Sequence, residues 1–516
     1  MATSKKTKQK RADIFARTRI LATLGPATDN DKIVAEMILA GANAFRLNFS
    51  HGTHADHAIR VARVRKVARR LKRPIAILQD LQGPKIRTGP VKGKGSVFLE
   101  VGTDVRVSHK FALTEPGLIS TVYKNLVSDV KVGESILLDD GLLELRCKSK
   151  TEDELVCQVI CGGPLRGKKG INLPGVNVSS PSLTKKDKED LIFGAKLGVD
   201  YVALSFVRKA KDITQLRAEL AKHGSNAAII AKIEKPEALK NLEDILEVSH
   251  GIMVARGDLG VELPGEQLPI IQKNIIAAAR QRGRIVVTAT QMLESMIENP
   301  RPTRAETSDV ANAILDGTDV VMLSGETAVG KQPVGVIETM TNIIRHTEGS
   351  NLYHGVMQKM NLDVGRDVAD ATVHAACTAA EELDARTLLA FSSSGRTCFK
   401  LSFARPRSRI VGATFEENVF NRLALCWGID VMWLKKAKNL DELYFFGERE
   451  LMDGGRTKIG DLSIVITGSN VSSGGTNSIK VHRVGNLDMT DSADVARRFT
   501  RLYVKHGSER KIERRS

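Results

Sequence analysis

The chain has 516 residues, of which 42% are hydrophobic, so it is too long for one core and can fill about two to four domains. No run of about 18 apolar residues occurs, and the basic N-terminus lacks the apolar stretch of a signal peptide, so we expect a cytoplasmic protein with no membrane partner. The net charge of +17, from 77 basic and 60 acidic residues, would by itself suit a nucleic-acid partner.

The positive charge is concentrated in three segments. They are a basic N-terminal tail at residues 1–17, a stretch at 60–73 and a basic C-terminal extension at 486–516. Apolar residues recur at helical spacing within the middle stretch, which predicts the solvated face of an amphipathic helix. We therefore expect no specific nucleic acid partner, although weak polyanion binding through the tails stays open. For the C-terminal extension, disorder and a short basic helix are both open.

Strand and helix patterns alternate from the start of the first domain. This alternation predicts parallel strands joined by crossover helices. The predicted strands lie at 19–24, 44–50 and 74–80, and the predicted helices at 29–40 and 54–72.

The alternation of strand and helix patterns stops at residue 83. Short alternating runs such as 96–101 and 134–139, separated by Gly and Asp turns, continue to about 180. This pattern predicts a small β domain over residues 83–180, inserted between a strand and its helix. The segment at 167–175 has the Gly and Pro residues of a hinge.

The strand and helix alternation then resumes and completes the first domain. Three strands before the insert and five after it make eight, which predicts a (β/α)8 TIM barrel, of the α/β class, over residues 18–82 and 181–350. Reactive groups of such barrels come from strand ends, where the chain has Arg46, Asp80, Lys232, Asp258 and Thr290. The five later strands are predicted near 199–207, 227–234, 251–257, 285–290 and 319–324.

Lys232, Glu234 and Asp258 form the most informative group. They follow two apolar runs whose carboxyl ends meet at one edge of the sheet. Two carboxylates there can hold a divalent cation, and a lysine can place an ammonium beside an anionic substrate. A purely structural ion pair between Lys232 and Glu234 is the alternative.

Residues 351–485 predict a third, α/β domain. A helix is expected at 366–382 and a strand at 387–391, followed by a hydroxyl-rich and Gly-containing loop before a helix. Backbone amides and hydroxyls in such a loop can bind a phosphate, although an ordinary Ser-rich turn is equally consistent. A second Gly-rich loop at 472–477 could face the first. The residues of the first loop are Ser392, Ser393, Ser394, Gly395, Arg396 and Thr397.

Ten motifs occur in an order that chance does not explain. They lie at 23–26, 46–52, 83–89, 139–141, 168–175, 205–208, 231–234, 255–260, 289–295 and 322–327. In this order they resemble the pyruvate kinase family over residues 18–485.

The resemblance implies a fold and an activity. It implies a barrel A domain, a lid-like inserted β-barrel B domain, a C-terminal α/β regulatory domain and a homotetramer. The implied reaction is the last step of glycolysis, in which phosphoenolpyruvate gives its phosphoryl group to ADP and leaves pyruvate. The loop at 392–397 would bind an activating effector, either a sugar phosphate or a nucleotide monophosphate.

Two rival interpretations are weighed against this one. A barrel lyase or aldolase acting on an enolate or 2-oxo acid would not account for the inserted β domain or the C-terminal phosphate loop. A catalytically idle, polyanion-binding scaffold is disfavoured by the intact set Arg46, Lys232, Glu234, Asp258 and Thr290.

The family pattern also implies roles for single residues. Glu234 and Asp258 would bind Mg2+ or Mn2+, and Lys232 would stabilise charge at the transferring phosphoryl group and enolate oxygen. Arg46 would contact the phosphate.

Further roles concern the rest of the substrates. The amides of Gly257 and Asp258 would hold the substrate carboxylate at a helix start. Thr290 would contact the substrate and help relay a proton to the enolate carbon. The nucleotide phosphates would be bound by Asn48, His51, Arg87 and Lys169.

The sequence departs from the family at the monovalent-cation site. Most members have an acidic residue in place of Lys85, and Thr and Lys in place of Leu81 and Gln82, and that pattern accompanies a required potassium ion. Lys85 would bring its own fixed charge, so we expect the potassium-independent branch, unless Lys85 is only a surface lysine paired with a neighbour. The positions concerned are Asn48, Ser50, Asp80, Leu81 and Lys85.

Overall fold

The computed structural model describes residues 16–93, 95–359, 367–468 and 475–486. It divides into two compact units, the first running to residue 361 and also containing residues 425–427. Residues 1–15 of the basic tail, 472–474 of the second Gly-rich loop and the extension beyond 486 lie outside the described residues. Within the described part, no helix has the length and apolar character to cross a membrane.

Eight parallel strands form a closed barrel in the first unit, which confirms the predicted (β/α)8 fold. Their order around the barrel is β1-β16-β15-β14-β13-β12-β3-β2. The strands are β1 (Arg19–Thr23), β2 (Ala44–Asn48), β3 (Ala76–Asp80), β12 (Tyr201–Leu204), β13 (Ala228–Ile233), β14 (Gly251–Ala255), β15 (Ile285–Ala289) and β16 (Val320–Leu323).

The barrel strands are buried along almost their whole length, because one face packs in the barrel interior and the other against helices. This burial explains the continuous apolar runs in the sequence. Gly251, at the start of β14, shows how tightly the strands pack, since a Cβ there would lie 2.6 Å from the carbonyl oxygen of Ile285.

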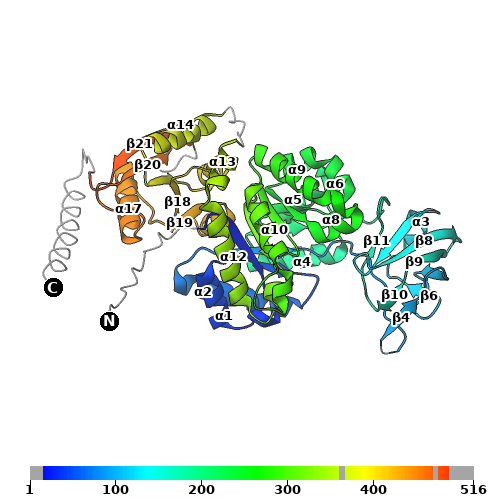
Figure 1. Ribbon diagram of the computed structural model, residues 1–516. Helices are drawn as coiled ribbons and strands as arrows, with labels where there is room; N and C mark the ends of the chain where they lie inside the picture. Colours follow the sequence, from blue (N-terminus) through cyan, green and yellow to red (C-terminus); the bar gives the residue numbers. More distant parts are fainter. Residues whose placement is uncertain (1–15, 94, 360–366, 469–474, 487–516) are drawn as a thin grey trace, which may run out of the picture. The chain divides into compact units, whose positions relative to one another are not determined.

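Helices surround the barrel in Figure 1, and several start at a capping box. The basic helix α2 buries Val61 and Val64 on one face, while Arg60 and Arg63 on the other pair with Asp29. The helices are α1 (Asp31–Ala40), α2 (His54–Leu71), α4 (Lys185–Leu197), α5 (Ala210–Lys222), α6 (Pro236–Lys240), α7 (Leu242–Val248), α8 (Arg256–Glu262), α9 (Leu268–Gln281), α10 (Arg304–Leu315), α11 (Gly325–Ala328), α12 (Pro333–Glu348) and α13 (Asn351–Lys359).

A β-rich insert with its own hydrophobic core separates β3 from α4, drawn in cyan and light blue in Figure 1. Its larger sheet has the order β11-β7-β8-β9-β5-β6, and β10 pairs with β4. The elements are β4 (Ser96–Leu99), β5 (Asp104–Ser108), β6 (Leu118–Ser120), α3 (Leu126–Asp129), β7 (Ser135–Leu138), β8 (Leu143–Lys150), β9 (Glu154–Cys161), β10 (Gly163–Arg166) and β11 (Ile171–Asn172).

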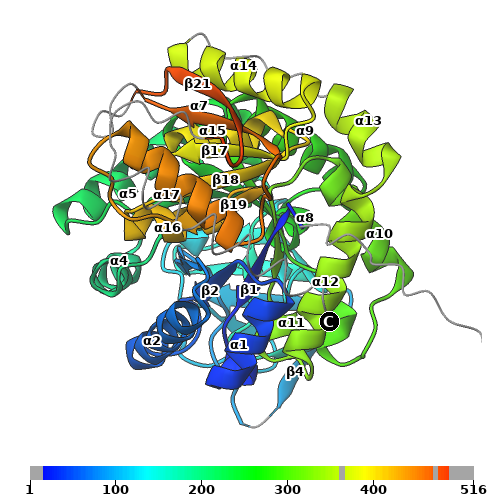
Figure 2. The same ribbon diagram turned by 90° about the vertical axis from the view of Figure 1, so that its left-hand side faces the viewer.

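The second unit is an α/β domain built on a five-stranded sheet of order β19-β18-β17-β20-β21. In Figure 2 the helices α14 and α17 lie on either side of this sheet, and α17 packs on the core around Leu389 and Val465. The elements are α14 (Val368–Glu382), β17 (Thr387–Phe391), α15 (Arg396–Ala404), β18 (Arg409–Thr414), α16 (Glu417–Arg422), β19 (Ile429–Trp433), α17 (Leu440–Asp453), β20 (Leu462–Thr467) and β21 (Ser478–Arg483).

Candidate active site

The carboxyl ends of the barrel strands carry most of the predicted site residues. Arg46 lies in β2, Asp80 ends β3 and Lys232 lies in β13. Glu234 and Thr290 directly follow β13 and β15. Because all eight strands are parallel, these side chains belong to the same rim of the barrel.

Four of these charged groups form one buried cluster. Nε and Nη2 of Arg46 each lie 2.7 Å from Oδ2 of Asp80. Nζ of Lys232 lies 3.2 Å from Oδ1 of Asp80 and 2.9 Å from Oε1 of Glu234. Asp80 and Glu234 are only 2% and 1% exposed, so the two cations are needed to balance two carboxylates that water does not reach.

The environment shifts the pKa of three of these groups. Burial acts to raise the pKa of Asp80, but Lys232 and Arg46 outweigh it and hold that pKa below its usual range. Burial acts to lower the pKa of Lys232, but Asp80 and Glu234 hold it above its usual range. Burial raises the pKa of Glu234, and the charge of Asp258 adds to that rise. The Lys232 ammonium therefore keeps its charge, while Glu234 would be stabilised by a further cation.

Glu234 and Asp258 are the two carboxylates at this rim that could hold a divalent ion. Oε2 of Glu234 accepts a 2.8 Å hydrogen bond from the amide of Phe206, which orients the carboxylate, and Asp258 lies in the first turn of α8. In the described ranges, no group of three or more His, Cys, Asp or Glu side chains is placed to hold a metal. Two carboxylates are nevertheless what Mg2+ needs, because it takes its remaining ligands from water and substrate phosphates.

Thr290 has a strained backbone beside this position. Its φ of 69° is in the left-handed region, which is costly for a β-branched residue and is typical of functional sites. Its hydroxyl donates to the carbonyl of Ala289 at 2.6 Å and accepts from the amide of Gly257 at 2.8 Å. The hydroxyl therefore lies at the start of α8, and the Gly257 amide that was predicted to hold a substrate carboxylate donates to it.

Positive charge gathers around His51. Burial lowers the pKa of His51, and the charges of Arg87, Arg46 and Lys85 lower it further. A site with this many cations is suited to phosphate groups. The structure therefore brings His51 within the electrostatic reach of Arg87, another predicted nucleotide residue, and of Arg46 and Lys85.

The other two predicted nucleotide residues are held by local bonds. Lys169 of the insert forms a 2.7 Å ion pair with Asp139. Oδ1 of Asn48 accepts a 3.1 Å hydrogen bond from the amide of Ser50. The loop after β2 is thereby shaped by one of its own predicted functional side chains.

The monovalent-cation positions are already rich in charge. Nζ of Lys85 lies 3.9 Å from Oδ1 of Asp258, and the two side chains are 30% and 28% exposed. Asp80 is paired with both Arg46 and Lys232, and the Leu81 side chain is buried. Lys85 therefore supplies a fixed positive charge next to a predicted metal ligand.

Sequence reasoning missed several residues at this rim. Nζ of Lys232 donates to Oγ of Ser205 at 2.7 Å, although Ser205 had been noted only as part of a motif. Lys235 forms a buried 2.6 Å ion pair with Glu262, and Asn172 of the insert donates to the same carboxylate at 3.3 Å. The positions of Ser205 and Lys235, just past the ends of β12 and β13, are the signal that could have identified them.

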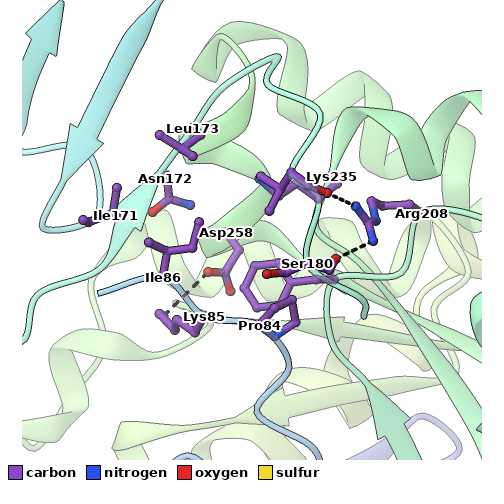
Figure 3. Close-up of a pocket in the computed structure, with 12 residues that line it drawn as sticks. Pro84, Lys85, Ile86, Ile171, Asn172, Leu173, Ser180, Arg208, Lys235 and Asp258 are labelled. Atoms are coloured by element: carbon purple, nitrogen blue, oxygen red, sulfur yellow. Dashed lines mark hydrogen bonds and ion pairs between the residues drawn. The ribbon is translucent and has the colours of Figure 1, made fainter. Parts of the chain in front are cut away.

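A pocket opens beside Asp258, between the insert and the barrel (Figure 3). It has an apolar wall and a charged rim. Figure 3 shows Lys85 and Asp258 facing each other across one side of it. The lining residues are Pro84, Lys85, Ile86, Ile171, Asn172, Leu173, Val178, Ser180, Phe206, Arg208, Lys235 and Asp258.

The predicted effector loop lies between β17 and α15 in the second unit. The hydroxyl of Ser392 accepts from the amide of Gly395 at 2.9 Å, and Gly395 has a φ of 84°, which favours glycine. Oγ1 of Thr397 lies 2.6 Å from Oγ1 of Thr476. This contact joins the loop to the described end of the second Gly-rich segment.

Comparison with known proteins agrees with the fold and shows the family. Residues 15–337 match the family model for the pyruvate kinase barrel domain, and residues 370–482 match that for the pyruvate kinase alpha/beta domain. The chain is 43% identical over 472 residues to a pyruvate kinase of Staphylococcus aureus strain MRSA252, covering 91% of this chain and 80% of that protein. It is 44% identical over 473 residues to a pyruvate kinase of Staphylococcus haemolyticus, with the same coverage of both chains. The chain therefore belongs to the pyruvate kinase family.

Proposed function

We propose that this site transfers the phosphoryl group of phosphoenolpyruvate to ADP, producing pyruvate and ATP. The observation that carries this proposal is the Lys232 ammonium, held between the buried carboxylates of Asp80 and Glu234 at 3.2 and 2.9 Å. A fixed cation at this rim stabilises the charge that develops as the enolate leaves. Family membership supports the same reaction.

Each side chain of the site has a separate role in the proposed reaction. Glu234 and Asp258 would hold Mg2+ or Mn2+, which supplies Lewis-acid stabilisation of the substrate oxygens. Arg46 binds the phosphate, and its ion pair with Asp80 fixes the direction of its guanidinium. Thr290 contacts the substrate and helps relay a proton to the enolate carbon. The amides of Gly257 and Asp258 bind the carboxylate once the Thr290 hydroxyl releases the Gly257 amide.

The nucleotide is bound on the other side of the phosphate. Asn48, His51, Arg87 and Lys169 would contact its phosphates, because the charges of Arg87, Arg46 and Lys85 already act on His51. Phosphoryl transfer between two reactants held in line needs little covalent chemistry from the protein. Positioning and charge stabilisation therefore account for the rate of transfer.

The test is pyruvate formation from phosphoenolpyruvate, with ADP and Mg2+ each present or omitted. Pyruvate only when both are present supports the kinase. Pyruvate without ADP would indicate a lyase-type or hydrolytic reaction, and no pyruvate under any condition would indicate a scaffold.

We further propose that the reaction does not need potassium, because Lys85 lies 3.9 Å from Asp258 and supplies a cation itself. Turnover is expected to change by less than about twofold when tetramethylammonium replaces potassium. Lys85→Glu is expected to create a potassium requirement, whereas Lys92→Glu, on the surface of the insert, is the control. Strong potassium activation of the unaltered enzyme would contradict the proposal.

We also propose that the loop at 392–397 binds a sugar phosphate or nucleotide monophosphate that activates a cytoplasmic homotetramer. The helix N-terminus at Arg396 and the surrounding hydroxyls support an anion site. Arg396→Ala is expected to abolish activation while leaving turnover at saturating substrate within about twofold. An effector response equal to that of the unaltered enzyme would count against this assignment, and sedimentation velocity checks the tetramer.

A further inference from the structure

Two chain connections join the insert to the barrel. The first runs from β3 through residues 81–84, and the second runs from β11 through residues 173–184 into α4. Arg87 and Lys169 both belong to the insert, so their positions relative to the barrel depend on how these connections are held.

One buried carboxylate binds both connections. Asp187, which is 0% exposed, accepts the amide of Gly83 on Oδ1 at 3.1 Å. Its Oδ2 accepts the amide and the hydroxyl of Thr184 at 2.9 and 2.5 Å. At the start of α2, Oδ2 of Asp56 makes the same capping box with Thr53, which shows that capping needs one carboxylate oxygen. The second oxygen of Asp187 is therefore used for the connection at Gly83.

Both connections also pack on Ser205 and Phe206 of the barrel. Gly83 has a φ of 68°, and a Cβ there would lie 2.8 Å from Cδ2 of Phe206 and 3.0 Å from Cβ of Ser205. On the second connection, Oγ of Ser182 donates to the carbonyl of Phe206 at 2.8 Å. This dipeptide is thus a common support for the two connections.

The same dipeptide binds the catalytic cluster. Oγ of Ser205 accepts from Nζ of Lys232 at 2.7 Å and donates to the carbonyl of Leu81, on the first connection, at 2.7 Å. The amide of Phe206 donates to Oε2 of Glu234 at 2.8 Å. A continuous set of hydrogen bonds therefore runs from Lys232 through Ser205 to Leu81, at the start of the first connection.

We propose that Asp187 is a positioning residue, whose carboxylate fixes both connections and thereby places Arg87 and Lys169 against the nucleotide. The inference rests on the proposed nucleotide role of Arg87 and Lys169 and extends it to a residue of α4. Asp187 itself is buried and is not among the residues proposed to contact the substrates.

The test variant is Asp187→Asn, which has the same shape. Its amide presents one oxygen and one NH2 donor, so it cannot accept hydrogen bonds from both Gly83 and Thr184. The KM for ADP is expected to rise at least about tenfold with a fall in kcat, because a small displacement of binding groups is costly. The dissociation constant for phosphoenolpyruvate without nucleotide is expected to stay within about twofold, because Arg46 and Lys232 are barrel residues.

Thr184→Val is the matched control. It removes the capping hydroxyl from the same helix end but keeps the amide hydrogen bonds of Gly83 and Thr184 to Asp187, so the KM for ADP is expected to stay within about twofold. Equal effects in the two variants, or an unchanged KM in Asp187→Asn, would overturn the proposal. Arg87→Gln tests the nucleotide role separately from the positioning role of Asp187. An unchanged KM for ADP in Arg87→Gln would refute the role of Arg87 in nucleotide binding.

Hydrogen exchange on the unaltered enzyme gives a second readout that does not depend on the folding of Asp187→Asn. The Gly83 amide is expected to exchange as slowly as the amides of β3, since it is buried and bonded to Asp187. Exchange as fast as in the exposed loop at 110–113 would contradict the proposed attachment.

Discussion

Lys232→Met is expected to lower kcat by about a hundredfold to a thousandfold or more, because it removes the cation at the transferring phosphoryl group. It also leaves Asp80 and Glu234 with one cation fewer in a buried site. Loss of one partner from a buried ion pair typically costs about 3–5 kcal/mol, so a lower thermal midpoint is expected as well. Steady-state kinetics and thermal unfolding measure the two effects separately.

Lys235→Met is the control for this loss of stability. Lys235 is another buried lysine at the same strand end, paired with Glu262 at 2.6 Å. Its removal is expected to destabilise the barrel by a similar mechanism while kcat stays within about tenfold. If both variants lost the same fraction of kcat, the effect of Lys232 would be structural and its catalytic role would be wrong.

Glu234→Gln is expected to weaken Mn2+ binding at least about tenfold, because one of two proposed metal carboxylates becomes neutral. The substitution keeps an oxygen that can accept from the Phe206 amide. Electron paramagnetic resonance of free Mn2+ reports binding without any dependence on activity. A fall in kcat of about a hundredfold should accompany it.

Glu262→Gln is the matched control for the metal prediction. Glu262 is a buried carboxylate paired with Lys235 and lies four residues after Asp258 on α8. Its neutralisation is expected to leave the affinity for Mn2+ within about twofold, because it is not a proposed ligand. Equal loss of Mn2+ affinity in both variants would show that Mn2+ binding depends on net charge and that Glu234 is not a ligand.

The barrel was predictable because the sequence patterns that specify its strands and helices are local. Apolar runs such as β13 and β14 are buried on both faces, and the capping box at Thr184 marks the start of a helix. Strand ends also predicted that Lys232 and Asp80 lie at one rim, since parallel strands leave no other arrangement.

The pairing within the rim was not predictable in the same way. The sequence placed Asp80 at a strand end and at a monovalent-cation position but did not predict its partners, and it binds Arg46 and Lys232 through different oxygens. The bond from Gly83 to Asp187 joins residues 104 positions apart, and neither residue type signals it. Such contacts depend on which strand neighbours which and on how the insert returns to the barrel.

The most direct test of the account follows the phosphoryl group itself. Phosphoenolpyruvate labelled with phosphorus-32 is incubated with Mg2+ and ADP, using the unaltered enzyme, Lys232→Met and Lys235→Met. The account predicts that the label moves to ATP with the unaltered enzyme and with Lys235→Met, and that transfer is nearly lost with Lys232→Met. Label released as inorganic phosphate, or transfer that Lys232→Met leaves intact, would contradict it.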